Sequence, residues 1–290
     1  MCSMLSKIIR NIPKGVRICE YIKMIDYKLI AVDMDGTLLT DNKKITIPTL
    51  EGINNLIKEN KIFCISTGRP FYGVKPYLDI IEGDIPLILY NGAIVTFSKT
   101  KKVLLSCNLT ADQSTKILDI INKYDGTFIF WSDEKLYVNK INDYTTKYFG
   151  ISKAEPILLN EKIVIPHGNI TKIIWFDENE KLVEYQNTIL KDVNDVNFFT
   201  SQPVFLEFVS QGISKAKAME VIGDYYNIKP SEMIAVGDGC NDIPMLEYAG
   251  LGVAMANASD DVKDNADYIT LSNEEDGVLK VINEFMLRRR

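Results

Sequence analysis

The chain has 290 residues, of which 46% are hydrophobic and 25% charged, so it can bury a full core in one large domain or two ordinary ones. Its formal net charge of −6 argues against a general nucleic-acid binder, and no apolar run approaches the roughly 18 residues that a membrane span needs. A single histidine, His167, excludes most histidine-based catalysis and histidine-rich metal sites.

Five cysteines are scattered along the chain without a Cys-x-x-Cys pair. Their odd number and their spacing predict neither a disulfide framework nor a zinc site. We therefore expect a cytoplasmic protein, because the cytoplasm keeps such thiols reduced.

Residues 1–26 carry basic residues among short apolar pieces that are broken by Pro13 and Gly15. A signal peptide would need a longer apolar core and a small-residue cleavage site. A weakly amphipathic helix that touches a membrane is an alternative. We expect a loose N-terminal extension without stable membrane association, followed by a folded domain that begins near residue 24.

The first predicted strand, 29–32, is an apolar run that leads into two acids, Asp33 and Asp35, and then Gly36. Two close anions after a buried strand repel each other unless a cation lies between them. Because ligands bind at the carboxyl ends of the strands in an α/β sheet, the pair predicts a site for a cation and an electrophile. The alternative is a strand followed by an ordinary aspartate-rich turn.

The second predicted strand, 61–66, follows a helix over 47–59 that has a proline near its start. It ends in Thr67, Gly68 and Arg69, which can face a phosphate through a hydroxyl, a backbone N–H and a guanidinium. Thr67 could equally be the cap of the next helix, and Arg69 could pair with a core carboxylate.

A helix over 71–81 and a third strand over 86–90 come next, and that strand ends in the turn that begins with Asn91. Segments 94–97 and 103–107 predict a hairpin. Strands and helices alternate up to this point, as a doubly wound parallel sheet requires.

Between about residues 110 and 208 the pattern changes to strand pairs interleaved with helices, which is typical of an α+β module with an antiparallel sheet. Because alternation resumes afterwards, we interpret this module as an inserted second domain. The predicted boundaries are 27–93 and 209–290 for an α/β core and 94–208 for the insert. Its predicted elements are helix 111–124, strands 127–131 and 136–139, a helix near 144, strand 171–176, helix 178–190 and strands 196–200 and 205–209.

Ser214 is predicted to cap a helix over 215–226, and the next strand, 233–236, ends in a second acidic turn with Asp238 and Asp242. If this strand neighbours the first, the carboxylates of both turns converge without histidine or cysteine, which suits Mg²⁺. The remaining predicted elements are helix 243–249, strand 251–255, helix 260–265, strand 268–270 and a final helix from about residue 274.

Phosphoryl transfer needs this kind of set: a metal, a lysine, hydroxyl or amide donors and a placed nucleophile. Lys215, Thr67 and Asn91 could complete it, although Lys215 taken alone is more often an ordinary surface lysine. The chain has neither a Gly-x4-Gly-Lys-Ser/Thr loop nor a Gly-x-Gly-x-x-Gly turn, so it offers no cradle for a nucleoside triphosphate or a dinucleotide.

The sequence Asp-Met-Asp-Gly-Thr-Leu-Leu at 33–39 resembles the first motif of the haloacid dehalogenase superfamily of phosphatases. The resemblance to its Cof-type branch, subfamily IIB, extends in order over about residues 27 to 285. It rests further on the segments 66–69, 91–93, 212–215, 237–242, 252–258 and 266–270. The branch carries its cap domain between the second and third motifs, where the inserted second domain is predicted, so the resemblance implies a C2-type cap.

The resemblance implies that Asp33 attacks phosphorus and becomes an aspartyl phosphate, while Asp35 protonates the leaving oxygen and then deprotonates water. It implies a Mg²⁺ ion bound by the carboxylates of Asp33 and Asp238 and by the Asp35 backbone carbonyl. Asp242 is implied to support the metal site without binding the ion directly. The residues implied to hold phosphate and substrate are Thr67, Gly68, Arg69, Asn91, Lys215 and Asn241.

The implied activity is a Mg²⁺-dependent phosphatase for small phosphorylated metabolites, sugar phosphates above all, with pyridoxal phosphate and flavin mononucleotide as further substrates. One alternative is a phosphomutase or sucrose-phosphate phosphatase of the same superfamily. Another is a signalling or binding module that merely carries a phosphoaspartate, although such a module has no need of an acid like Asp35. We expect a monomer or a weak homodimer.

Overall fold

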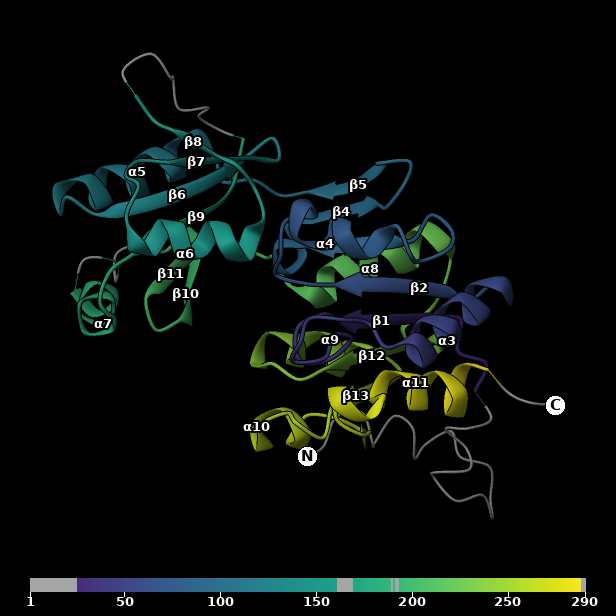
Figure 1. The fold of residues 1–290 in the computed structure, drawn as a ribbon. Helices are drawn as coiled ribbons and strands as arrows, with labels where there is room; N and C mark the ends of the chain where they lie inside the picture. Colours follow the sequence, from purple (N-terminus) through teal and green to yellow (C-terminus); the bar gives the residue numbers. More distant parts are fainter. Residues whose placement is uncertain (1–24, 161–168, 189, 191–192, 288–290) are drawn as a thin grey trace. The chain divides into compact units, whose positions relative to one another are not determined.

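The computed structural model describes residues 25–160, 169–188, 190 and 193–287, so nearly all of the predicted N-terminal extension lies outside the described residues. These residues divide into two compact units (Figure 1). The first lies within 25–68, 77–105 and 214–287, and the second comprises 69–76 and 106–213. Each unit is described below by itself.

The first unit is built on a sheet that has eight strands among the described residues. Its strands are β1 (Leu29–Asp33), β2 (Ile62–Ser66), β3 (Pro86–Leu89), β4 (Ile94–Phe97), β5 (Val103–Ser106), β12 (Met233–Gly237), β13 (Leu251–Ala254) and β14 (Tyr268–Ile269). They lie in the order β14-β13-β12-β1-β2-β3-β4-β5. The six strands from β14 to β3 are mutually parallel, so the carboxyl ends of β1, β2 and β12 meet at one edge.

Helices connect these strands as a doubly wound α/β sheet requires, in agreement with the sequence prediction. They are α3 (Ile47–Lys58), α8 (Lys215–Tyr226), α9 (Ile243–Tyr248), α10 (Asp260–Asp264) and α11 (Gly277–Val281), together with α4 (Phe71–Leu78), of which residues 71–76 belong to the second unit. Short 3-10 turns occupy Tyr90–Gly92, Pro230–Glu232, Cys240–Asp242 and Asn273–Glu275, and a π-helical turn occupies Ile282–Met286.

The central strands are apolar because both of their faces are covered. All five residues of β1 and of β12 are buried. On one face, Leu29 and Ala31 pack in a cluster with Ala218 and Met219 of α8. The predicted cap Ser214 starts α8, since its hydroxyl accepts from the Lys217 N–H at 3.1 Å.

Two predictions for this unit need correction. The hairpin β4–β5, assigned by the predicted boundaries to the insert, lies at the edge of the eight-stranded sheet, where β4 pairs antiparallel with β3. The predicted final helix from residue 274 is broken at Asp276, which has a φ of 56°. That bend turns the Asp276 carboxylate to the hydroxyls of Thr46 (2.5 Å) and Thr49 (3.0 Å) at the start of α3.

The second unit carries a sheet with six strands among the described residues, in the order β10-β11-β9-β6-β7-β8. Its pairs are antiparallel except for β7 with β8. Its elements are α5 (Ala111–Lys123), β6 (Thr127–Ser132), β7 (Lys135–Val138), α6 (Asp143–Ser152), β8 (Pro156–Leu158), β9 (Ile170–Phe176), α7 (Asn179–Thr188), β10 (Val196–Gln202) and β11 (Phe205–Ser210). β8 was not predicted, because its three residues carry too little pattern.

One face of this sheet forms an apolar cluster with α5 and α7, which contribute Ile117 and Leu182. The other face holds a buried ion pair between Lys172 and Glu207, 3.0 Å apart. Among the described residues of the chain, no helix is both long and apolar enough to cross a membrane.

Candidate active site

The nucleophile candidate Asp33 is the last residue of β1, and it lies against the buried ammonium group of Lys215. The Lys215 Nζ atom is 2.5 Å from Asp33 Oδ1 and 2.5 Å from Asp242 Oδ1, and it also donates to the Ser66 carbonyl at 3.2 Å. Lys215 begins α8, whose Ser214 cap fixes that end, so the lysine is held between the ends of three strands and not on the surface.

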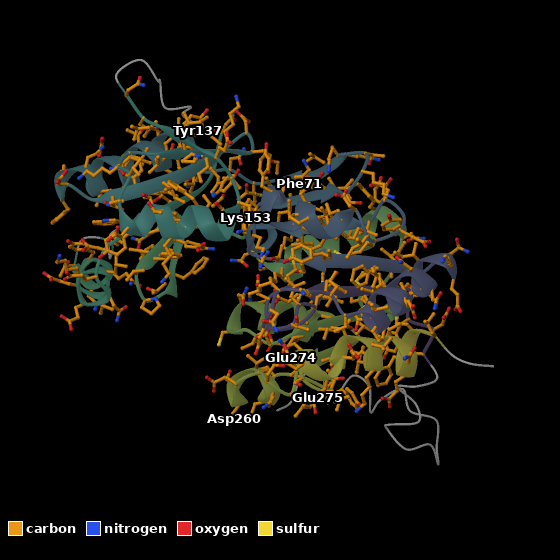
Figure 2. The ribbon with its side chains drawn as sticks, in the orientation of Figure 1. Phe71, Tyr137, Lys153, Asp260, Glu274 and Glu275 are labelled. Carbon is orange, nitrogen blue, oxygen red and sulfur yellow. The ribbon has the colours of Figure 1, made fainter. Side chains whose placement is uncertain are left out.

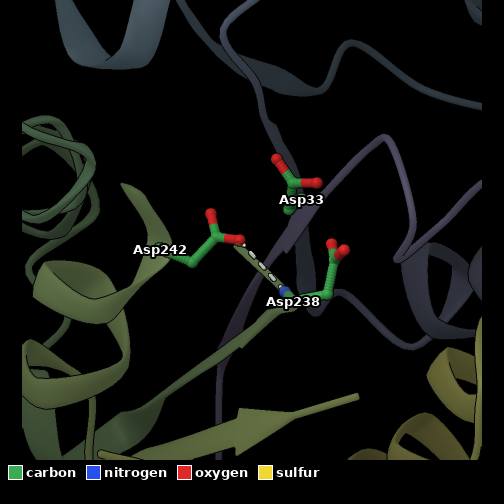
Figure 3. A group of neighbouring side chains, drawn as sticks. All are labelled: Asp33, Asp238 and Asp242. Carbon is green, nitrogen blue, oxygen red and sulfur yellow. Dashed lines mark hydrogen bonds between the residues drawn. The ribbon is translucent and has the colours of Figure 1, made fainter. Parts of the chain in front are cut away.

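The two acids after β12 have different surroundings. Both oxygens of Asp242 are engaged, because Oδ1 accepts from Lys215 and Oδ2 accepts from the N–H groups of Asp238 (3.0 Å) and Gly239 (2.9 Å). The Asp238 carboxyl group is turned away from these contacts towards the side of Asp33, as Figure 3 shows. Carboxylate oxygens of Asp33, Asp238 and Asp242 all lie within 4.8 Å of one another.

Burial perturbs the protonation of this cluster. Burial raises the pKa of Asp33 to about 8, because the nearby Asp242 and Asp238 carboxylates add to its effect and the Lys215 ammonium offsets it only in part. Burial also raises the pKa of Asp238, against the opposing hydrogen bond from Thr37. Burial alone would lower the pKa of Lys215, but the Asp242 and Asp33 carboxylates outweigh it and raise that pKa.

The cluster therefore holds more negative charge than one ammonium group can balance. Its donors among the described residues are carboxylate and carbonyl oxygens, which suit a hard divalent cation of the Mg²⁺ class. Asp33 and Asp238 each have an oxygen available for such an ion, whereas both Asp242 oxygens are occupied. The residues present thus fit a divalent cation.

The turn after β1 is shaped around Asp238. Gly36 has a φ of +80°, and a Cβ atom placed on it would lie 2.3 Å from Asp238 Oδ2. The next residue, Thr37, donates its hydroxyl to Asp238 Oδ1 at 2.6 Å. Thr37 was part of the first motif but received no predicted role, and only its position opposite Asp238 in the structure identifies it as a support for that carboxylate.

The same turn is tied to the C-terminal part of the first unit by two asparagines: Asn257, which lies in the matched segment 252–258 but received no predicted role, and Asn273, which the sequence did not single out. Asn257 donates to the Gly36 carbonyl at 2.8 Å and accepts from the Asn273 N–H at 3.1 Å. Asn273 donates to the Leu39 carbonyl at 3.0 Å. Glu274, labelled in Figure 2, accepts from the Asp41 N–H at 2.6 Å. More than 200 residues separate Gly36, Leu39 and Asp41 from these side chains along the chain, so no local sequence pattern predicts the contacts.

The polar residues after β2 and β3 meet through their backbone. The Thr67 N–H donates to the Ile88 carbonyl at 2.8 Å, and the Asn91 N–H donates to the Thr67 carbonyl at 3.0 Å. Asn91, at a φ of 58°, accepts from the Asn241 side chain at 3.1 Å, which links the turns after β3 and β12. Gly68 lies against Asn91, since a Cβ atom there would be 3.0 Å from Asn91 Oδ1.

The two remaining predicted site residues, Arg69 and Asp35, make other contacts. Arg69 belongs to the second unit and donates from Nη1 to the Gly73 carbonyl at 2.9 Å. Asp35 projects from the turn after β1, and its Oδ1 atom lies 3.0 Å from the Lys43 Nζ atom, a contact that the sequence did not predict.

Comparison with known proteins gives a family for this arrangement. The family model for haloacid dehalogenase-like hydrolases matches residues 30–282. The Bacillus subtilis protein YxeH is 34% identical over 271 residues, which cover 91% of this chain and 100% of the relative. The 5-amino-6-(5-phospho-D-ribitylamino)uracil phosphatase YitU of the same organism is 31% identical over 268 residues, covering 89% and 97%.

Solved structures agree with this result. The crystal structure of a haloacid dehalogenase-like hydrolase from Bacteroides thetaiotaomicron has a TM-score of 0.82 at 29% identity, and the match covers 89% of this chain and 98% of that one. The structure of TM0651 from Thermotoga maritima also reaches 0.82, at 28% identity, with 90% and 98% covered. The chain belongs to the haloacid dehalogenase-like hydrolase family and is a phosphatase, an enzyme that hydrolyses phosphoric monoesters.

Proposed function

We propose that the chain is a Mg²⁺-dependent phosphatase of small phosphorylated metabolites, sugar phosphates above all, that works through an aspartyl phosphate on Asp33. The observation that carries this proposal is the array in which Lys215 holds one oxygen of Asp33 while Asp242 holds Lys215. A carboxylate fixed in this way at the end of a buried strand is oriented for in-line attack on phosphorus.

Attack by a carboxylate on a phosphate anion is opposed by charge repulsion, which the Lys215 ammonium reduces. In the proposed sequence a carboxylate oxygen of Asp33 forms the bond to phosphorus while the bond to the leaving oxygen breaks. Asp35 gives that oxygen a proton, and it then takes a proton from the water that hydrolyses the aspartyl phosphate. Asp35 therefore separates this proposal from a module that only stores a phosphoryl group.

The proposed metal ligands are the carboxylates of Asp33 and Asp238 and the backbone carbonyl of Asp35. Bound there, Mg²⁺ would neutralise charge on the transferring phosphoryl group. Asp242 is proposed to support the site without binding the ion, because its two oxygens already accept from Lys215 and from the Asp238 and Gly239 N–H groups. Thr37 holds the Asp238 carboxylate in place.

Phosphate and substrate are proposed to be held by donors on the neighbouring turns: the Thr67 hydroxyl, backbone N–H groups near Gly68, and the side chains of Asn91 and Asn241. The hydrogen bond from Asn241 to Asn91 holds these two side chains next to each other. Arg69 is proposed as a further substrate contact.

The inserted second unit is proposed to be a C2-type cap that selects the substrate, and the enzyme is proposed to be a cytoplasmic monomer or weak homodimer. YitU, whose name gives a phosphorylated ribityl compound as its substrate, adds sugar-alcohol phosphates to the candidates. Pyridoxal phosphate and flavin mononucleotide are further candidates.

The test is a screen of about a hundred phosphorylated metabolites with detection of free phosphate, run with Mg²⁺ and with EDTA. We expect turnover of sugar or sugar-alcohol phosphates that vanishes with EDTA and returns with Mg²⁺. Asp33→Asn should keep the fold and lose turnover, because an amide cannot form the acyl phosphate. Full activity in a metal-stripped sample would contradict the metal assignment, and isomerisation without phosphate release would instead indicate a phosphomutase.

A further inference from the structure

Lys43 is held at a defined place beside Asp35 by the turn that contains it. The Lys43 N–H donates to the Thr40 carbonyl at 2.8 Å, and the Thr40 N–H donates to the Lys44 carbonyl at 3.0 Å. Lys43 has a φ of 57°, in the left-handed region that such a tight turn requires.

This turn is fastened to the rest of the first unit on two sides. The Tyr77 hydroxyl of α4 donates to the Lys43 carbonyl at 3.1 Å. The Asn273 side chain donates to the Asp41 carboxylate at 3.1 Å as well as to the Leu39 carbonyl. The segment that carries Lys43 is therefore held by hydrogen bonds from two other parts of the unit, of which the Tyr77 bond reaches the Lys43 backbone itself.

From this backbone the Lys43 ammonium reaches Asp35 Oδ1 at 3.0 Å. The side chains are 55% and 41% exposed, so the ion pair itself adds little to stability, about 0–1 kcal/mol. Its effect is on geometry, because it restricts the rotation of a carboxyl group whose side chain is only partly covered by its surroundings. The contact with Lys43 therefore holds Oδ1, one of the two oxygens of this carboxyl group, at a defined place.

We propose that Lys43 is a positioning residue for Asp35, which fixes the orientation of the carboxyl group that exchanges protons with the leaving oxygen and with water. The inference rests on the proposed function, and it assigns to the turn at 40–44 a part in the reaction that the motif residues do not provide. Misplacing a reacting group by about 1 Å can cost up to 10²-fold in rate, which sets the scale of the expected effect.

The experiment compares Lys43→Gln and Lys43→Arg with the matched control Lys44→Gln in the full chain. Lys44 is the next residue of the turn and is also exposed, and among the described residues no hydrogen bond or ion pair of its side chain is seen. Steady-state rates are measured at saturating Mg²⁺ on p-nitrophenyl phosphate and on the alkyl phosphate that the wild type hydrolyses fastest, starting with glucose 6-phosphate.

We expect Lys43→Gln to lower kcat on the alkyl phosphate about tenfold, with a smaller loss on p-nitrophenyl phosphate, whose leaving group needs no proton. KM and the Mg²⁺ concentration for half-maximal activity should stay within a factor of about two of wild type, and the melting temperature within about 2 °C, because the fold and the metal ligands are untouched. Lys43→Arg should recover most of the rate, and Lys44→Gln should match wild type.

A double-mutant cycle tests whether Lys43 acts through Asp35. In an Asp35→Ala background, Lys43→Gln should have no further effect on the alkyl phosphate. Additive losses in that background, or equal rates for Lys43→Gln and Lys44→Gln in an active and Asp35-dependent enzyme, would overturn the inference while leaving the proposed function intact. Absence of any phosphatase activity in the wild type would overturn both.

Discussion

At the scale of single residues, the chemistry depends on how two buried carboxylates share one ammonium group. Lys215 is fully buried between Asp33 and Asp242, so removing its charge leaves two carboxylates without their partner. Breaking a buried pair in this way typically costs about 3–5 kcal/mol, because the remaining charge has no compensation.

Lys215→Met should therefore abolish turnover and also lower the melting temperature by more than about 5 °C. Lys217→Met is the matched control, because Lys217 lies on the same helix and pairs with Glu220 on the exposed surface. It should change the melting temperature by no more than about 2 °C. Equal and small shifts in differential scanning calorimetry would show that the Lys215 pair does not compensate the buried charge.

The raised pKa of Asp33 gives a prediction for pH. In the metal-free protein this pKa lies near 8 against an ordinary value of 3.8, so the folded state keeps a proton that the unfolded chain releases. The Asp33 contribution to stability is therefore full below pH 4 and is lost as the pH rises towards 8. Mg²⁺ must displace that proton at pH 6 but not at pH 8.5.

The rise in melting temperature caused by Mg²⁺ should consequently be larger at pH 8.5 than at pH 6, and Asp33→Asn should remove this difference. Thermal denaturation with and without 10 mM MgCl₂, about the scale of a saturating concentration, measures it. An effect of Mg²⁺ that is independent of pH in the wild type would mean that the ion does not compete with a proton on Asp33.

At the scale of elements, the turn after β1 depends on a glycine at position 36 because the Asp238 carboxylate lies against it. Gly36 and Gly212 both have positive φ values, +80° and +75°, so alanine costs a similar backbone strain at each position. They differ in what a Cβ atom would meet. At Gly36 it would lie 2.3 Å from Asp238 Oδ2, and at Gly212 it would meet nothing within 4 Å.

Gly36→Ala should raise the Mg²⁺ concentration for half-maximal activity at least tenfold, because it displaces the Asp238 carboxylate. Gly212→Ala should lower stability by about 1 kcal/mol and leave the Mg²⁺ requirement unchanged. Magnesium titrations of the steady-state rate make the comparison, and the same titration curve for both variants would contradict the place given to Asp238.

Sequence predicted the local part of this arrangement and missed its long-range part. The sequence predicted strands β1, β2 and β12 and the polar turns at their carboxyl ends. Each is an apolar run that ends in Asp, Gly or Thr, a pattern visible within ten residues. The contacts of Asn257 and Asn273 with the turn after β1 were not predicted, because each joins segments more than 200 residues apart. The Lys43–Asp35 pair was missed because a tight turn folds the lysine back.

At the scale of the whole molecule, the prediction of an α/β sheet with an α+β insertion describes the two sheets but not the boundary between them. The sequence of β4 and β5 fits the end of the core sheet and the start of the insert equally well, because a hairpin pattern does not determine which sheet the hairpin pairs with. The antiparallel pairing of β4 with β3 in the structure assigns the hairpin to the eight-stranded sheet.

The predicted independence of the N-terminal extension belongs to this scale. Pro13 and Gly15 and the lack of an apolar stripe predict that residues 1–23 do not support the active fold. A chain that begins at Met24 should match the full chain in melting temperature and in turnover. A large loss in either property would mean that the extension packs on the folded part or mediates assembly.

The central claim, that Asp33 carries the phosphoryl group, is tested most directly by trapping that group. Asp35→Ala should slow hydrolysis of the intermediate while p-nitrophenyl phosphate still forms it, because that leaving group needs no proton. After an acid quench, mass spectrometry of this variant should find one phosphoryl group on the peptide that contains Asp33, and none when Asp33→Asn is added. An unphosphorylated Asp33 peptide, together with turnover that persists in Asp33→Asn, would contradict the account.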